Sequence, residues 1–102
     1  MNKLIPIPPS EHLKEFLEEM NVTAYRLAKE TGMPQTRIGD IINKGRSITA
    51  DTAMRLGRFF GTSAQFWMNL QTSYDLKVAD MEHGKDYAKI YSYCRLTINQ
   101  RN

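Results

Sequence analysis

The sequence predicts an all-α protein, with one domain of five helices followed by a short C-terminal extension. Two observations support this fold class. Five segments between residues 9 and 80 place apolar side chains three and four residues apart, which is the spacing of an amphipathic helix. The links between these segments carry glycine, proline, serine or threonine, the residues that commonly begin and end helices. We assign residues 1–80 to the domain and residues 81–102 to the extension.

Length and composition are those of a single small globular domain. The chain has 102 residues, of which 41% are hydrophobic, enough for one compact core. No apolar run approaches the roughly 18 residues of a membrane helix and no basic-then-apolar leader is present, so we expect neither a membrane span nor a signal peptide. The only cysteine, Cys94, cannot form an internal disulfide, which is consistent with a cytoplasmic protein.

The first helix is expected to begin near Pro9, after an extended segment that contains three prolines. Its apolar stripe has the spacing i, i+3, i+4, i+7 and consists of Leu13, Phe16, Leu17 and Met20. Its outer face is acidic and carries Glu11, Glu15, Glu18 and Glu19.

Residues 23–45 have the pattern of two short helices joined by a tight turn. Thr23 can cap the first of these helices, and Gly32 can end it through a left-handed conformation. Pro34 suits the first turn of the second helix. The apolar residues of that helix form one narrow stripe, Ile38, Ile41 and Ile42. This arrangement is a helix–turn–helix, in which the second helix is free to enter a major groove.

The exposed side chains of this region are suited to contact DNA. Glutamine can pair with adenine and arginine with guanine, while threonine can contact either a base or a thymine methyl group. We expect Asp40 to accept from a cytosine amino group, to orient Arg37, or to be a helix-surface charge that at most repels wrong sequences. The polar residues at the end of the helix and Thr23 with the N–H groups that it caps suit phosphate contacts. The predicted DNA-binding residues are Thr23, Gln35, Thr36, Arg37, Asp40, Asn43, Lys44 and Arg46.

Positive charge is concentrated in the same region. Residues 23–62 carry seven basic and three acidic side chains, a net charge of +4, whereas residues 1–20 carry a net charge of −2. Phosphate binding requires such a distribution. Ordinary solvated helix faces would produce it equally well, so charge alone does not decide between the two explanations.

The last two helices are expected to begin at Thr49 and near the sequence Thr62–Gln65, which offers a capping box. The fifth helix carries more apolar side chains than one small core needs. A single helix–turn–helix reads only a few base pairs, so specific binding usually requires a dimer on an inverted repeat of double-stranded DNA. We therefore predict a homodimer, with contacts from Phe66, Trp67, Leu70 and Tyr74.

Residues 87–98 are rich in aromatic and β-branched side chains and lack helical periodicity. This segment is expected to be either a strand that pairs with another chain or a partly ordered tail.

The sequence does not favour an enzyme. His12 and His83 lie far apart and neither has the spacing of a metal ligand pair, and we find no glycine-rich phosphate loop or Cys–His pattern. Cys94, among tyrosines, has the character of a small hydrophobic residue. We expect no cofactor and no metal.

The stretch from Thr23 to Asp75 resembles a known family. The sequences RLAKETGMPQTRIGDIIN and ITADTAMRLGRFFGTSAQFWMNLQTSYDL are similar to the HigA/VapI group of antitoxins, within the Cro/C1-type (XRE) repressors of lambda-repressor-like fold. The resemblance implies a cytoplasmic, nucleoid-associated homodimer that represses its own operon and neutralises a RelE-like mRNA-cleaving toxin by binding it. It also places Gln35, Thr36 and Arg37 at the DNA-reading end of the recognition helix, with Asn43 near the phosphate backbone.

Two departures from the family pattern concern the DNA- and toxin-binding ends. The chain has Pro8-Pro9-Ser10-Glu11 where members commonly have His-Pro-Gly-Glu, and Lys44-Gly45 where many have glycine followed by a basic residue. Two other functions fit the same residues: a stand-alone repressor without a toxin partner, and an interaction module that no longer binds DNA.

Overall fold

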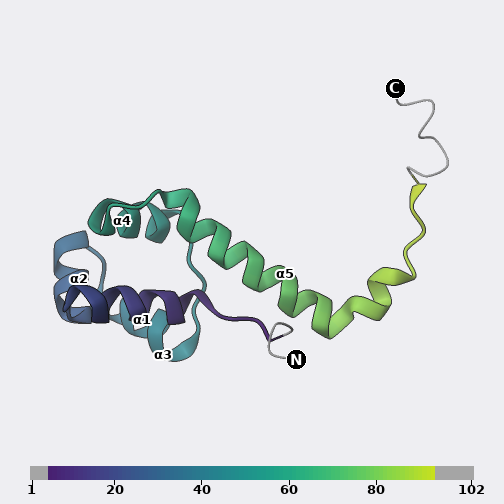
Figure 1. Ribbon diagram of the computed structural model, residues 1–102, viewed down its shortest axis with the longest axis horizontal. Helices are drawn as coiled ribbons and strands as arrows, with labels where there is room; N and C mark the ends of the chain where they lie inside the picture. Colours follow the sequence, from purple (N-terminus) through teal and green to yellow (C-terminus); the bar gives the residue numbers. More distant parts are fainter. Residues whose placement is uncertain (1–4, 94–102) are drawn as a thin grey trace, which may run out of the picture.

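The computed structural model describes residues 5–93, and this part of the chain folds into five α-helices (Figure 1). The helices are α1 (Pro9–Met20), α2 (Ala24–Thr31), α3 (Gln35–Lys44), α4 (Ala50–Phe60) and α5 (Ala64–Ala88). The predicted all-α class with five helices is thereby confirmed. The first four helices and the start of α5 form a compact body, with α2 and α3 as the helix–turn–helix.

Local capping explains where the helices begin and end. The hydroxyl oxygen of Thr23 accepts from the backbone N–H of Arg26 at 3.0 Å, as predicted for the start of α2. Gly32 ends this helix with φ 73°, a left-handed conformation that glycine adopts without a steric penalty. The predicted capping box at residues 62–65 is wrong. The N-cap of α5 is Ser63, whose hydroxyl oxygen accepts from the N–H of Phe66 at 3.0 Å.

The core contains side chains from every helix and from the α3–α4 loop. Its buried apolar members are Leu13, Leu17, Leu27, Ala28, Met33, Ile38, Ile41, Ile48, Ala53, Leu56, Phe60 and Trp67. Two residues of the predicted isoleucine stripe, Ile38 and Ile41, are 0% and 1% exposed, and Ile42 packs against the core from its edge. Burial of this stripe turns the opposite face of α3 toward solvent.

Trp67 lies at the centre of an aromatic cluster at one end of the core. Its ring centroid is 5.2 Å from that of Phe16 and 5.9 Å from that of Phe60. Its indole N–H donates to the hydroxyl of Thr62 at 2.9 Å, and the side chain is 0% exposed. The prediction that Trp67 makes a dimer contact is therefore wrong, because no part of its surface is free to meet a second chain.

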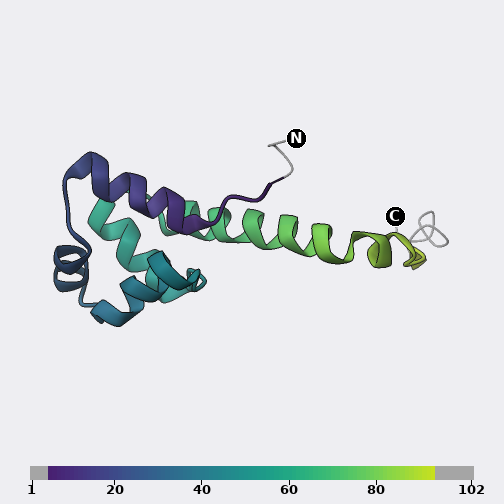
Figure 2. The ribbon, with the colours of Figure 1, turned by 90° about the horizontal axis from the view of Figure 1, so that it is seen from below.

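Helix α5 extends beyond the body formed by the other helices. Its first turns pack on α4 and α1, and its second half projects away from both in two perpendicular views (Figures 1 and 2). The helix continues past residue 80 as far as Ala88, with one irregular residue, His83, at φ −132°. The change of pattern near residue 80 therefore does not mark the end of α5, which bends at His83 and continues.

The predicted strand at residues 87–98 is not present in its described part. Tyr87 and Ala88 complete α5, and the N–H of Ile90 donates to the Tyr87 carbonyl at 3.0 Å in a terminal turn, so residues 87–93 contain no strand. Residues 94–98 of the prediction lie outside the described residues. The error has a physical reason: strand propensity is weak and context-dependent, and continuing an existing helix needs no new nucleation.

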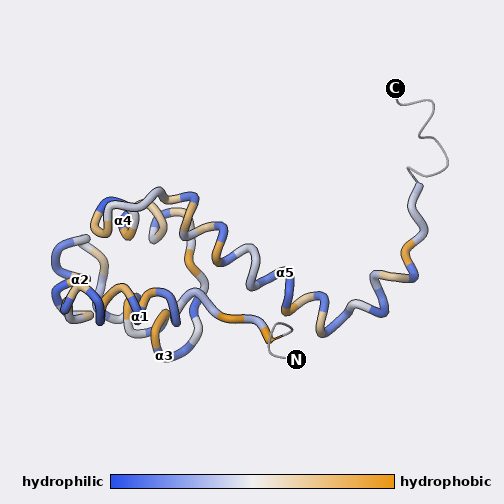
Figure 3. Tube along the Cα trace, viewed as in Figure 1, coloured by the Kyte–Doolittle hydropathy of each residue, from blue (hydrophilic) through white to orange (hydrophobic). Residues whose placement is uncertain are grey.

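Hydrophobic residues occur along the projecting half of α5 and after it (Figure 3). Several of their side chains are exposed. Leu76 is 66% exposed and Met81 is 62% exposed, and the group continues with Tyr87, Ile90, Tyr91 and Tyr93. The surplus apolar surface predicted for the fifth helix thus lies mainly further along the chain than predicted. Among the described residues, no helix combines the length and apolar character needed to cross a membrane.

Candidate nucleic-acid interface

The first turn of α3 presents its polar side chains to solvent. Gln35 and Thr36 are both exposed, because Ile38 and Ile41 fix the opposite face of the helix against the core. Pro34 holds the turn before them in an extended conformation and forms the N-cap of α3. These two residues therefore lie where the sequence predicted the DNA-reading end of the helix.

A small charged cluster lies at the other end of α3. The carboxylate of Asp40 is 3.6 Å from the ammonium group of Lys44 and 3.7 Å from the guanidinium group of Arg46. The side chains of Lys44 and Arg46 remain 78% and 53% exposed, so both are accessible to a phosphate. Asp40 thus pairs with these two residues, as a helix-surface charge would, and the alternative that it orients Arg37 is wrong.

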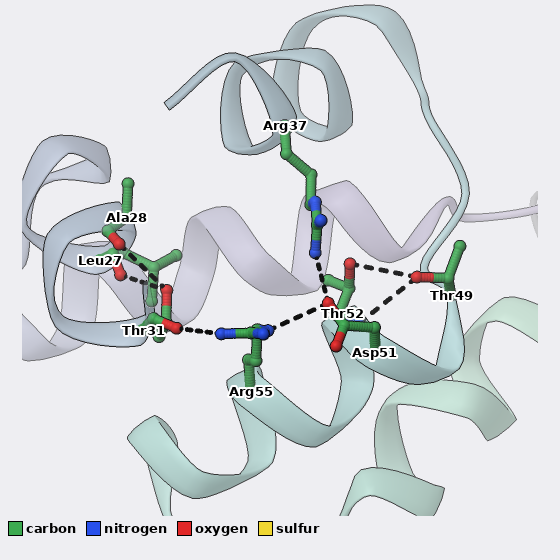
Figure 4. Close-up of polar contacts among 8 residues, drawn as sticks. All are labelled: Leu27, Ala28, Thr31, Arg37, Thr49, Asp51, Thr52 and Arg55. Atoms are coloured by element: carbon green, nitrogen blue, oxygen red, sulfur yellow. Dashed lines mark hydrogen bonds and ion pairs between the residues drawn. The ribbon is translucent and has the colours of Figure 1, made fainter. Parts of the chain in front are cut away.

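The side chain of Arg37 reaches from α3 toward α4 (Figure 4). Its Nη1 lies 2.6 Å from Oδ2 of Asp51, a residue in the first turn of α4, and its side chain is only 27% exposed. Arg37 follows Gln35 and Thr36 directly in the sequence, but its guanidinium group is paired with α4 whereas their side chains are exposed. This residue was predicted to meet a guanine, and in the free protein it is bound to another helix.

Asp51 also binds Arg55, one turn further along α4. Arg55 Nε donates to the same carboxylate oxygen at 3.0 Å, and its Nη1 donates to the carbonyl of Thr31 at 2.8 Å (Figure 4). Hydrogen bonds from Arg37 and then Arg55 hold the pKa of the Asp51 carboxyl below its ordinary value of 3.8. We call Arg37, Asp51 and Arg55 the arginine clamp; it connects α2, α3 and α4.

The loop between α3 and α4 is anchored by a buried glutamine. Gln71 of α5 is 6% exposed, and its Oε1 accepts from the backbone N–H of Ile48 at 2.7 Å. Its amide nitrogen donates to Asp75 at 2.9 Å, so both ends of the side chain are paired. Because Ile48 follows Arg46 by two residues, this contact helps to fix the basic end of α3.

The other two predicted contacts lie on the exposed surface. Thr23 is exposed at the N-terminus of α2, where its hydroxyl oxygen already caps the helix. Asn43 is exposed in the last turn of α3. Six of the eight predicted DNA-binding residues are therefore exposed, and the other two, Arg37 and Asp40, are partly buried.

Sequence analysis missed three residues that organise this surface: Asp51, Arg55 and Gln71. The acidic and basic pair at positions 51 and 55 has the i, i+4 spacing of a helical ion pair, which was a usable signal for that contact. The Arg37–Asp51 and Ile48–Gln71 contacts span 14 and 23 residues, and no local pattern indicates them. Within residues 5–93, no three histidine, cysteine, aspartate or glutamate side chains gather closely enough to hold a metal ion.

The five-helix body with an exposed second helix defines a helix–turn–helix regulator. The helix-turn-helix family model matches residues 13–67. Virulence-associated protein I of Dichelobacter nodosus is 46% identical over 82 residues, which cover 79% of this chain and 76% of that protein. The chain belongs to the helix-turn-helix family of the XRE type, among relatives named HigA and VapI. This is a family of antitoxins and transcription regulators, not of enzymes.

Two further comparisons agree with this assignment. Antitoxin HigA-1 of Vibrio cholerae is 38% identical over 72 residues, which cover 70% of this chain and 68% of that protein. A solved structure of Pseudomonas aeruginosa antitoxin HigA with the higBA promoter is 43% identical, with a TM-score of 0.81, and the match covers 87% of this chain and 99% of that one. The family expected from the sequence is thereby confirmed.

Proposed function

We propose that this protein is a sequence-specific DNA-binding homodimer that represses its own operon and is the antitoxin of a HigBA-type module, neutralising a RelE-like mRNA-cleaving toxin by binding it. The exposed first turn of α3 carries the DNA-binding part of this proposal. Gln35 can donate to and accept from an adenine edge, and Thr36 can hydrogen-bond a base or contact a thymine methyl group. The solved structure of Pseudomonas aeruginosa antitoxin HigA with the higBA promoter supports the same use of the fold.

The phosphate contacts are proposed to surround this reading surface. Lys44 and Arg46 supply positive charge at the end of α3, where Asn43 is also exposed. Thr23 and the free N–H groups at the start of α2 supply hydrogen-bond donors. Asp40 keeps the two cations close together and can accept from a cytosine amino group.

A dimer is proposed because one such surface reads only a few base pairs of an inverted repeat. The partly exposed Phe66, Leu70 and Tyr74 remain candidates for the dimer contact, together with the apolar residues of the projecting half of α5. We propose that the protein acts at the nucleoid in the cytoplasm, where operator DNA is found.

The DNA-binding part is tested by measuring affinity for the promoter region of the protein's own gene and for random DNA at several salt concentrations. Gln35→Ala should cost about 1–3 kcal/mol on the cognate site and relax the base preference there. Lys44→Ala should weaken binding to all sequences and reduce the salt slope by about one unit. Gln65→Ala is the matched control, since Gln65 is an exposed glutamine on α5. Equal affinity of the wild-type protein for both DNAs would contradict specific binding.

The toxin part is tested by co-expressing the neighbouring gene with and without this one. Growth arrest that this protein relieves, together with a complex of fixed ratio in native mass spectrometry, is the expected result. A stand-alone repressor predicts intact operator binding with no co-purifying partner and no rescue of growth. A stand-alone repressor would use the same α3 surface as an antitoxin, so DNA-binding data do not distinguish the two functions.

A further inference from the structure

We propose that Arg37 is a positioning residue that acts through Asp51 and does not itself read a base. Its Nη1 is 2.6 Å from Asp51 Oδ2, and the pairing joins α3 to α4 (Figure 4). Its side chain is 27% exposed, compared with 53% for Arg46 and 78% for Lys44. Arg37 is thus the least exposed of these three cations, and its guanidinium group is paired with a carboxylate of α4. The inference rests on the proposed DNA-binding function.

Arg55 holds Asp51, the partner of Arg37, in place. It donates to Asp51 Oδ2 at 3.0 Å and to the Thr31 carbonyl at 2.8 Å. That carbonyl lies in the last turn of α2, where carbonyl groups have no partner within the helix. The clamp therefore relates the end of α2, the first turn of α3 and the first turn of α4. The tilt of α3 determines where Gln35 and Thr36 meet a base, so a change in the clamp is transmitted to them.

A base-reading role for Arg37 would disrupt these contacts. To reach a guanine, the guanidinium group would have to break its hydrogen bond to Asp51. That bond is charge-assisted and belongs to the strong class. The abandoned carboxylate would then remain close to DNA phosphates, which repel it. Since ion pairs at partly exposed positions contribute little to stability, we expect the clamp to affect the geometry of DNA recognition more than the stability of the fold.

The test compares the ratio of affinities for the promoter fragment and for random DNA at one salt concentration. The variants are Arg37→Ala, Asp51→Ala and the double variant, with Arg58→Ala as a control because Arg58 is an exposed arginine on α4 outside the clamp. We expect each single change to lower the ratio about tenfold, a loss typical of coupled residues, and the double variant to match either one. Arg58→Ala should leave the ratio unchanged.

Base preference separates the two roles of Arg37. Positioning predicts that Arg37→Ala and Asp51→Ala weaken preference at all positions read by α3 to the same extent. Base reading predicts that Arg37→Ala relaxes one base pair only, while Asp51→Ala frees Arg37 and leaves the ratio unchanged or raised. Either feature of that second pattern overturns the proposal. Asp51→Asn, which retains the shape of the side chain, replaces Asp51→Ala if circular dichroism shows that the alanine variant is unfolded.

The failure of this inference differs from the failure of the proposed function. A wild-type protein that prefers its promoter, with ratios unaffected in Arg37→Ala and Asp51→Ala, overturns the clamp alone. A wild-type protein without any preference overturns both proposals.

Discussion

Replacing Gln71 by methionine should destabilise the protein through one buried hydrogen bond. The Oε1 atom of Gln71 accepts from the N–H of Ile48 at 2.7 Å, and the two residues are 6% and 2% exposed. Methionine has a similar length but no comparable acceptor. The backbone N–H of Ile48 would remain in the interior without a partner or access to water.

The expected cost follows from the asymmetry of buried hydrogen bonds. Leaving a buried donor without a partner costs about 1–3 kcal/mol. This exceeds the net contribution of an ordinary hydrogen bond, whose two partners bind water instead when the protein unfolds. For a domain of this size each kcal/mol lowers the melting temperature by about 4–8 °C. Loss of the bond from Gln71 to the exposed Asp75 adds only a few tenths of a kcal/mol.

Gln65→Met is a closely matched control on the same helix. Gln65 also donates to a side chain four residues later, Asn69, at 2.8 Å, but both residues are exposed. The comparison therefore isolates the buried contact to Ile48 from the substitution itself. We expect Gln65→Met to change the free energy of unfolding by about 0.2–0.5 kcal/mol.

Urea unfolding measured by tryptophan fluorescence is a suitable assay, because the single tryptophan, Trp67, is buried in the core. Both variants should be compared with the wild type at one protein concentration, since association would shift the apparent stability. If Gln71→Met costs no more than Gln65→Met, the buried bond does not anchor the loop and the reasoning is wrong.

Four further predictions concern stability. Gly39→Ala should raise the free energy of unfolding by about 0.5–1 kcal/mol, since nothing lies within 4 Å of the added Cβ. Gly57→Ala should lower the free energy of unfolding by about 1–3 kcal/mol, because its Cβ would lie 2.9 Å from the Thr62 carbonyl oxygen. Equal urea midpoints for Gly39→Ala and Gly57→Ala would contradict these opposite effects. Thr23→Ala removes the cap of α2 and should cost about 1 kcal/mol, and no shift in midpoint would refute this. The lowered pKa of Asp51 means that its pairing stabilises the fold above pH 3.8 and that this contribution is lost as pH falls through the lowered value. The difference in stability between wild type and Asp51→Asn should therefore shrink from about pH 6 to about pH 2.5, and a constant difference would contradict the assignment.

The sequence by itself determined that there are five helices and which face of α3 is exposed. Caps such as Thr23 and stops such as Gly32 act within four residues, so their signals are local. The burial of Ile38 and Ile41 follows from a spacing of three residues on one helix, and it exposes Gln35 and Thr36 on the other side. Fold class and the exposed face of α3 were predictable for this reason, and the family was predictable from the resemblance of residues 23–75.

Only the tertiary structure decided which of these side chains are free to act. Arg37 turns toward Asp51, 14 residues away, and Gln71 binds the backbone of Ile48, 23 residues away. Trp67 fills the aromatic cluster and not a dimer contact, because Phe16 and Phe60 converge on it from other helices. Such choices depend on the distances and angles between packed helices, and these are set by the whole core and not by any local spacing.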